Sequence, residues 1–293
     1  MIYRFINRSI PTYALLLAVG CSAGGGATSA ATCGFVMPNP AGAGLPHAAS
    51  YQESANGTVT DRVTGLTWDG LASAATVTQS QAVAYCARRG RPWRLPTRIE
   101  LVSLVDFTVP SPGPTINPIF RDTPATVFWT SSLAVDSASS VWGVFFDIGY
   151  ADVDDVSDAG NARCVSAPGG AAPCDQHHYS GAGPGEITDV ATGLTWKQDP
   201  APQAATWARA KSYCAGLGGA WRLPSMTELQ TLVDVHQAGS TIDPQAFPNT
   251  EAVVFWTSSP VAGMDIYAWG VDFGSGTTTN PDVTSPYAVR CVR

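Results

Sequence analysis

Lysine is nearly absent from this sequence: of its 16 basic residues only Lys197 and Lys211 are lysines, and charged residues make up 13% of the chain. No run of like charges and no heptad pattern appears. Acidic residues number 23, so the net charge at pH 7 is -7. Nucleic acids and anionic membrane surfaces are bound by clustered positive charge. The composition therefore argues against both as partners.

The sequence also lacks an apolar segment near its beginning that is long enough to span a bilayer, because the apolar segment there covers only residues 13–19. It follows Arg4 and Arg8 and leads through small residues to Cys21, which is the order of a cleaved export signal. Its end, Ala-Val-Gly-Cys, resembles a bacterial lipobox, in which the cysteine becomes the lipidated first residue. We therefore expect residues 1–20 to be a signal peptide and Cys21 to carry lipid. Loss of the two arginines leaves 14 basic and 23 acidic residues, a net charge of -9.

The sequence also lacks the cysteine and histidine spacing of zinc sites, since it has no CxxC pair and no Cys/His cluster. The cysteines number seven, an odd count for an exported protein. With Cys21 lipidated, six remain, and an oxidising compartment allows them to pair. The six are Cys33, Cys86, Cys164, Cys174, Cys214 and Cys291.

Internal duplication is the strongest positive signal. The segment ending Thr-Gly-Leu-Thr-Trp at 60–68 returns at 188–196, and the offset between matching positions is 128 in the first half and 127 in the second. The other matches are Tyr-Cys (85, 213), Trp-Arg-Leu-Pro (93, 221), Val-Phe-Trp-Thr-Ser-Ser (127, 254) and Arg-Cys-Val (163, 290). We predict two copies of one domain, at 57–167 and 185–293, joined by a linker at 168–184. Residues 21–56, rich in Gly, Ala, Ser and Pro, are predicted to be a flexible tether after the lipidated cysteine.

Each copy is predicted to hold two helices followed by short strands. The Ala-rich segments 78–89 and 206–217 have apolar residues at helical spacing and end at a glycine. A second helix follows each Leu-Pro, where a capping box is expected, formed by Thr97 with Glu100 and by Ser225 with Glu228. Short strands are predicted to end at Trp68 and Trp196, and further strands are predicted in the first copy at 127–130, 141–146 and 162–165. The fold class is therefore α+β.

These motifs resemble the family named for the C-terminal domain of the bacterial collagen-like adhesin Lcl. The resemblance rests on a Gly-Leu-Thr-Trp opening, a helix cysteine, a Trp-Arg-Leu-Pro-Thr-x-x-Glu-Leu centre, a Trp-Thr-Ser strand and a closing Arg-Cys-Val, with the second copy equally complete. It implies two tandem C-type-lectin-like domains, each with a disulfide from the first helix to the last strand. The implied pairs are Cys86–Cys164 and Cys214–Cys291. Cys33 and Cys174 are left over, each just upstream of a domain, and are a candidate third pair that the resemblance does not imply.

The central motif also resembles the formylglycine-generating and sulfatase-modifying enzymes, which share that fold and depend on reactive, copper-binding cysteines. Here the helix and final-strand cysteines have structural partners under the first resemblance, and no electropositive niche for a thiolate is indicated. Glu100 and Glu228 are explained by the capping box, and the four histidines do not recur between copies. We therefore expect no catalytic activity.

Aromatic residues give the first binding hypothesis. Four tryptophans recur in both copies, and in small domains such residues are mostly core. Sugar sites use exposed aromatic faces, and Trp142 and Trp269 each begin a strand flanked by loops that differ between the copies. We predict these two as ligand-binding residues.

Calcium is the second binding hypothesis. The first copy has five aspartates within 12 residues, including Asp147, Asp152 and Asp154, and such oxygen-rich stretches suit a hard cation. The matching stretch of the second copy keeps only Asp282, and neither copy has the Glu-Pro-Asn or Trp-Asn-Asp triplet of calcium-dependent lectins. A solvated acidic loop is the default interpretation, with calcium as a candidate cofactor of the first copy alone.

Together these patterns predict a protein of the bacterial cell envelope, lipid-anchored at the outer membrane or cell surface, that binds a glycan or a surface protein without catalysis. Two linked copies favour avidity for a polymer. The resemblance implies adhesion, and the Lcl domain is associated with sulfated glycans, but a net charge of -9 disfavours a polyanion. A structural or scaffolding envelope lipoprotein is the alternative, and a formylglycine-generating-type enzyme ranks below both.

Overall fold

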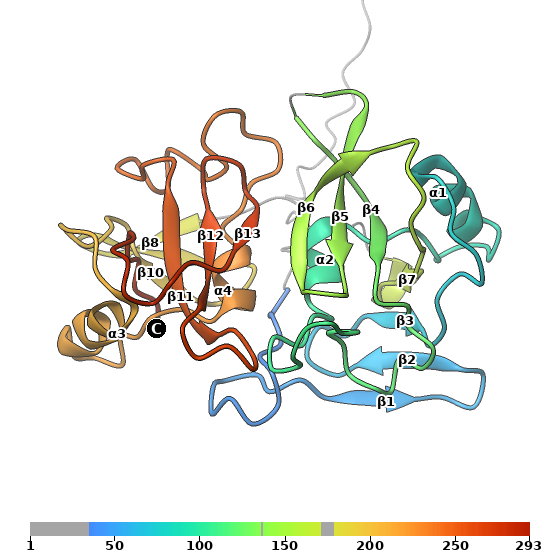
Figure 1. Ribbon diagram of the computed structural model, residues 1–293, viewed down its shortest axis with the longest axis horizontal. Coiled ribbons are helices and arrows are strands. Elements are labelled where there is room, and N and C mark those ends of the chain that lie inside the picture. The colour runs from blue at the N-terminus through green and yellow to red at the C-terminus, as the bar shows by residue number, and fades with distance from the viewer. Residues whose placement is uncertain (1–34, 136, 171–178) are drawn as a thin grey trace, which may run out of the picture. The chain divides into compact units, whose positions relative to one another are not determined.

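Antiparallel sheets organise each copy in the computed structural model, which describes residues 35–135, 137–170 and 179–293 (Figure 1). The first copy has a four-stranded sheet in the order β1-β2-β3-β7, made of β1 (Tyr51–Glu53), β2 (Thr58–Asp61), β3 (Thr67–Asp69) and β7 (Val165–Ser166). Its second sheet, in the order β4-β5-β6, contains β4 (Val127–Leu133), β5 (Ser140–Phe145) and β6 (Tyr150–Asp155). A 3-10 helix, η1 (Pro168–Gly170), follows β7.

The second copy repeats this plan with shorter sheets. Its first sheet, in the order β10-β9-β8, contains β8 (Tyr179–Gly183), β9 (Glu186–Asp189) and β10 (Thr195–Lys197). Its second, in the order β11-β12-β13, contains β11 (Val254–Pro260), β12 (Ala268–Asp272) and β13 (Thr278–Thr279). The predicted α+β class and tandem organisation are confirmed.

The helices match the sequence prediction closely. The first helix of each copy is α1 (Gln79–Ala87) or α3 (Trp207–Gly216), and Gly90 and Gly218 follow with φ of 81° and 69°. These left-handed angles suit glycine, which explains the ends of both helices. The second helix is α2 (Arg98–Val102) or α4 (Met226–Gln230), and it packs against the second sheet of its copy. Among the described residues, no helix is long and apolar enough to cross a membrane.

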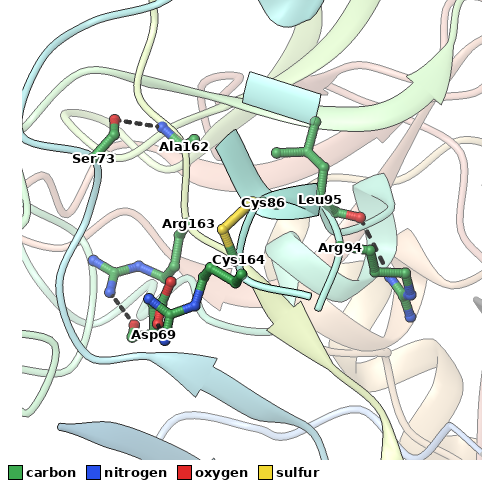
Figure 2. The surroundings of a disulfide bond; sticks show 9 residues. Asp69, Ser73, Cys86, Arg94, Leu95, Ala162, Arg163 and Cys164 are labelled. Atoms are coloured by element: carbon green, nitrogen blue, oxygen red, sulfur yellow. Dashed lines mark hydrogen bonds and ion pairs between the residues drawn. A yellow bond between two sulfur atoms is a disulfide. The ribbon is translucent and has the colours of Figure 1, made fainter. Parts of the chain in front are cut away.

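Two disulfides tie the first helix of each copy to its closing segment, as the sequence resemblance implies. Cys86 bonds to Cys164 with 5.4 Å between their Cα atoms (Figure 2). Cys214 bonds to Cys291 with 5.5 Å between their Cα atoms. The sequence separations are 78 and 77 residues. In the loop-entropy model each bridge stabilises the fold by about 4 kcal/mol. The predicted lipidation at Cys21 and the predicted Cys33–Cys174 pair lie outside the described residues.

The predicted flexible tether is wrong for residues 35–56, which belong to the fold. Phe35 and Met37 are buried, with 5% and 2% of their surfaces exposed, and the Phe35 N–H donates to the Ala191 carbonyl at 2.8 Å. Further along, β1 pairs antiparallel with β2. Residues of this segment thus bond to both copies: Phe35 to the second copy and β1 to the first. The Gly- and Ala-rich composition of the segment gives no sign of these contacts.

Two other predicted loops are strands. The predicted linker at 168–184 ends in β8, so the second copy begins before residue 185. The acidic stretch of the first copy contains β6, whose residues pair with β5 from Tyr150 to Asp155. Because β6 lies at the edge of its sheet in the strand order, its half-buried and exposed carboxylates are tolerated there, and such charges discourage pairing with another chain.

Both copies contribute to one hydrophobic core. The Trp269 ring of the second copy makes edge contacts with Phe107 and Tyr150 of the first, each with 5.3 Å between ring centroids. Arg98 is buried over the ring of Trp142 and donates to the Gly276 carbonyl at 3.2 Å. The two copies are therefore packed together rather than joined only by the linker.

We predict that Trp269→Ala lowers the free energy of unfolding by about 3–5 kcal/mol, because it removes a buried aromatic ring from the core shared by the copies. Urea unfolding followed by circular dichroism measures the change. The control is Leu133→Ala, a truncation of a side chain that is 65% exposed, with an expected effect within about 0.5 kcal/mol. Equal effects from both variants contradict the shared core.

Candidate functional site

The predicted ligand-binding tryptophans are interior residues. Trp142 on β5 and Trp269 on β12 expose only 3% and 4% of their surfaces. Their strands lie in the middle of three-stranded sheets, and each ring is covered by residues of the other copy or by Arg98. The expectation of an exposed sugar-stacking face is therefore wrong for both.

The predicted calcium ligands Asp147, Asp152 and Asp154 do not form a metal-binding group. In the described ranges, no cluster of three or more His, Cys, Asp or Glu side chains is placed to hold a metal ion. Asp152 and Asp154 each accept a hydrogen bond from the next backbone N–H, at 2.7 and 3.0 Å. Burial raises the pKa of Asp154, and the nearby carboxylate of Asp158 raises it further. The structure therefore gives the calcium hypothesis no support from geometry.

Glu100 and Glu228 have the capping role predicted from their spacing. In the second copy, the Glu228 carboxylate accepts from the Ser225 N–H at 2.8 Å and forms a bidentate pair with Arg222 at 2.6 and 2.7 Å. Glu100 does the same with Thr97 and Arg94. The Trp-Arg-Leu-Pro motif is thus explained in part by an arginine that neutralises the capping glutamate.

The arginine of each Arg-Cys-Val triplet is a buried residue that the sequence reasoning did not single out. Arg290 lies over the rings of Phe247 and Phe255, 4.5 and 5.6 Å from their centroids, and Arg163 lies likewise over Phe120 and Phe128. Burial lowers the pKa of Arg290 to about 9, opposed by the nearby Asp199 carboxylate. Its recurrence beside a disulfide cysteine is the sequence signal that points to it.

The two buried arginines, Arg163 and Arg290, donate hydrogen bonds to oxygen atoms of nearby segments. Arg290 donates to the carbonyls of Lys197 and Gln198 and to the Thr250 hydroxyl. Arg163, which lies beside Asp69 in Figure 2, donates to the Asp69 carbonyl at 2.6 Å. It also donates to the Thr123 hydroxyl at 2.7 Å. In both copies one guanidinium thus fixes the end of the third strand, β3 or β10, and the segment before the second sheet.

A groove of about 730 Å³ lies in the second copy, and two of the segments that line it adjoin the residues bonded by Arg290, Gln198 and Thr250. Its walls come from segments 199–204, 249–255 and 286–288, together with Asp272 at the end of β12. None of these segments was identified as a site from the sequence, because they meet only in the folded chain.

Hydrogen bonds between its walls give the groove a defined form. The Asn249 amide donates to the Asp199 carboxylate at 2.7 Å, which joins two walls directly. Backbone N–H groups of Ala205 and Ala201 donate to the carbonyls of Tyr287 and Val289 at 2.9 and 2.8 Å. The Tyr287 ring packs edge-on against Trp256 with 5.1 Å between centroids.

The lining combines apolar side chains with negative charge. Ala, Pro, Val and Phe residues supply most of it, and Tyr287 adds a half-buried ring. Asp199, Glu251 and Asp272 line it, and no Lys, Arg or His is found in the lining formed by the described residues. Such a surface suits a ligand with hydroxyl or cationic groups and opposes an anion.

The first copy lacks this chemistry at the equivalent positions. The offsets of the duplication place Leu71, Pro124 and Phe145 where the second copy has Asp199, Glu251 and Asp272. Strand pairing supports the match, since Val127 faces Phe145 as Val254 faces Asp272. The two copies therefore share a scaffold but differ at the groove.

Comparison with known families agrees with the duplication. Residues 57–166 and 185–293, most of the chain, match the family described as the Lcl C-terminal domain. No curated protein matches the chain.

We predict that Glu228→Gln lowers the free energy of unfolding at pH 7 by about 1.5–3 kcal/mol, because Arg222 loses its charged partner. Burial acts to raise the pKa of Glu228, but the hydrogen bonds and charge of Arg222, with further hydrogen bonds from Ser225 and Asn39, leave it below its ordinary value of 4.5. A carboxylate with a lowered pKa stabilises the fold above that ordinary value, and the stabilisation is lost as the pH falls through the folded-state pKa.

Urea unfolding at a series of pH values below 5 tests this. The variant is expected to lose less stability on acidification than the wild type. Glu251→Gln, at an exposed position, is the control and is expected to retain the wild-type profile. An unchanged acid dependence in Glu228→Gln contradicts the assignment.

Proposed function

Because the chain belongs to the Lcl C-terminal domain family, with two copies in tandem, we propose that it is a non-catalytic protein of the bacterial cell envelope that binds a glycan in the groove of its second copy. The groove is the observation that carries this proposal. Its apolar walls suit the C–H faces of sugar rings, while carboxylates and the Asn249 amide suit hydroxyl groups.

Disulfide pairing supports a non-catalytic role. Cys86, Cys164, Cys214 and Cys291 are all bonded, so none of them is a free thiolate for chemistry of the formylglycine-generating type. The capping glutamates are likewise engaged by arginines and backbone N–H groups. We also propose that each copy has the C-type-lectin-like fold, supported by the helix-to-closing-segment disulfides.

Anchoring completes the proposal: residues 1–20 direct export, and lipid on Cys21 holds the protein at the outer membrane or cell surface. The order of charges, apolar residues and cysteine supports it. These residues lie outside the described part of the chain.

A structural or scaffolding role in the envelope is the second candidate. The core shared by both copies favours it, because such packing holds two domains in one arrangement without any ligand. Binding of glycan to the groove distinguishes the two functions.

We predict that the purified protein binds oligosaccharides on a glycan array saturably, and that Ala204→Trp weakens this binding at least about tenfold by filling the groove. Ala204 is exposed, so the larger side chain is tolerated by the fold. Ala208→Trp, at an exposed position on α3 outside the groove, is the matched control. Equal binding by both variants excludes the groove as the site, and no binding to any glycan favours the scaffolding role.

Lipidation is tested separately. Labelled palmitate is expected to be incorporated into the wild-type protein in bacterial cells, while Cys21→Ser is expected to abolish labelling and leave the membrane fraction. Continued labelling of the variant contradicts the anchor.

A further inference from the structure

We propose that the groove of the second copy selects hexosamine oligomers with free, protonated amines over their N-acetylated or sulfated counterparts. This inference rests on the proposed glycan function and adds the chemical class of the ligand. It is carried by the placement of three carboxylates around one groove and by the divergence of the two copies there.

The three carboxylates reach the groove from three separate segments. Asp199 follows β10, Glu251 precedes β11, and Asp272 ends β12. A single occupant of the groove therefore meets acidic residues contributed by three separate segments of the lining. A linear oligomer with a charged group on every ring matches this distribution better than one isolated cation does.

These charges are largely uncompensated by the protein. Glu251 and Asp272 take part in none of the ion pairs among the described residues. Asp199 has the buried Arg290 nearby and accepts one hydrogen bond from Asn249, and Asp272 accepts one from the Gly274 N–H at 2.8 Å. An ammonium group on the ligand supplies the missing partner charge, whereas an acetamide offers only a weaker neutral hydrogen bond and a sulfate adds repulsion.

The shape of the lining favours a sugar over a basic peptide. Pro200, Pro202 and Pro286 restrict the backbone of the walls, and with the Tyr287 ring they add apolar surface to a lining that also contains the three carboxylates. In a hexosamine the amine is attached directly to the ring. One sugar unit can therefore place its C–H face on the apolar wall and its ammonium group beside a carboxylate. A lysine side chain separates its charge from the backbone by a flexible stem and loses more conformational freedom on binding.

Duplication provides an internal comparison. The first copy has the same buried arginine and the same strand pairing, yet it carries Leu71, Pro124 and Phe145 at the three acidic positions. The carboxylates are thus not needed to build the domain. Their presence in one copy alone points to a ligand requirement that the scaffold does not impose.

Calorimetric titration of the full protein with a β-1,4-linked glucosamine tetramer and with its fully N-acetylated form tests the inference, at low ionic strength and at a pH where the amines are protonated. The glucosamine tetramer is expected to bind at least about tenfold more tightly, with the preference reduced by added salt. The triple variant Asp199→Asn, Glu251→Gln, Asp272→Asn is expected to lose this preference.

The matched control removes three carboxylates from the first copy, as Asp152→Asn, Asp154→Asn, Asp158→Asn, and is expected to keep the preference. Equal affinity for both tetramers overturns the amine selectivity but leaves glycan binding intact. Binding of neither tetramer, together with a blank glycan array, overturns both proposals. An oligolysine of equal charge that binds as tightly as the glucosamine tetramer overturns recognition of the sugar.

Discussion

A buried arginine beside the last disulfide cysteine is the constraint on which each copy depends. Arg163 and Arg290 are fully buried against phenylalanine rings, and their N–H groups bind carbonyl and hydroxyl oxygens of two loops. A guanidinium is expensive to remove from water, so those oxygens must stay in place. Because the adjacent cysteine is bonded to the first helix, one residue pair fixes the closing segment, the helix and both loops.

This arrangement separates the scaffold from the surface that it supports. The arginine binds mainly backbone carbonyls and a threonine hydroxyl, so the loop side chains facing solvent are free to change. In the second copy they supply Asp199 and Glu251 to a groove, while the first copy has Leu71 and Pro124 at these positions. The fold itself stays the same in both.

Local chemistry could be predicted from the sequence, and long-range packing could not. The capping box at Thr97–Glu100 and the glycine ends of the first helices follow from local sequence and are present. The two disulfides, which join residues 78 and 77 positions apart, were expected only from the family resemblance. The burial of Trp142 and Trp269 was missed because the sequence pattern of a strand does not show that the other copy covers its face. The groove could not be predicted because its walls are far apart in the chain. One signal of it was present in the sequence: Asp272 replaces Phe145 between two otherwise similar strands.

Mapping of ligand contacts by NMR is the most direct test of the central claim, that function resides in the groove of the second copy. With backbone amides assigned, titration of a bound oligosaccharide is predicted to shift the signals of segments 199–204, 249–255 and 286–288, leaving the equivalent first-copy segments unchanged. Shifts centred on the first copy, or spread without a focus over both, contradict the account.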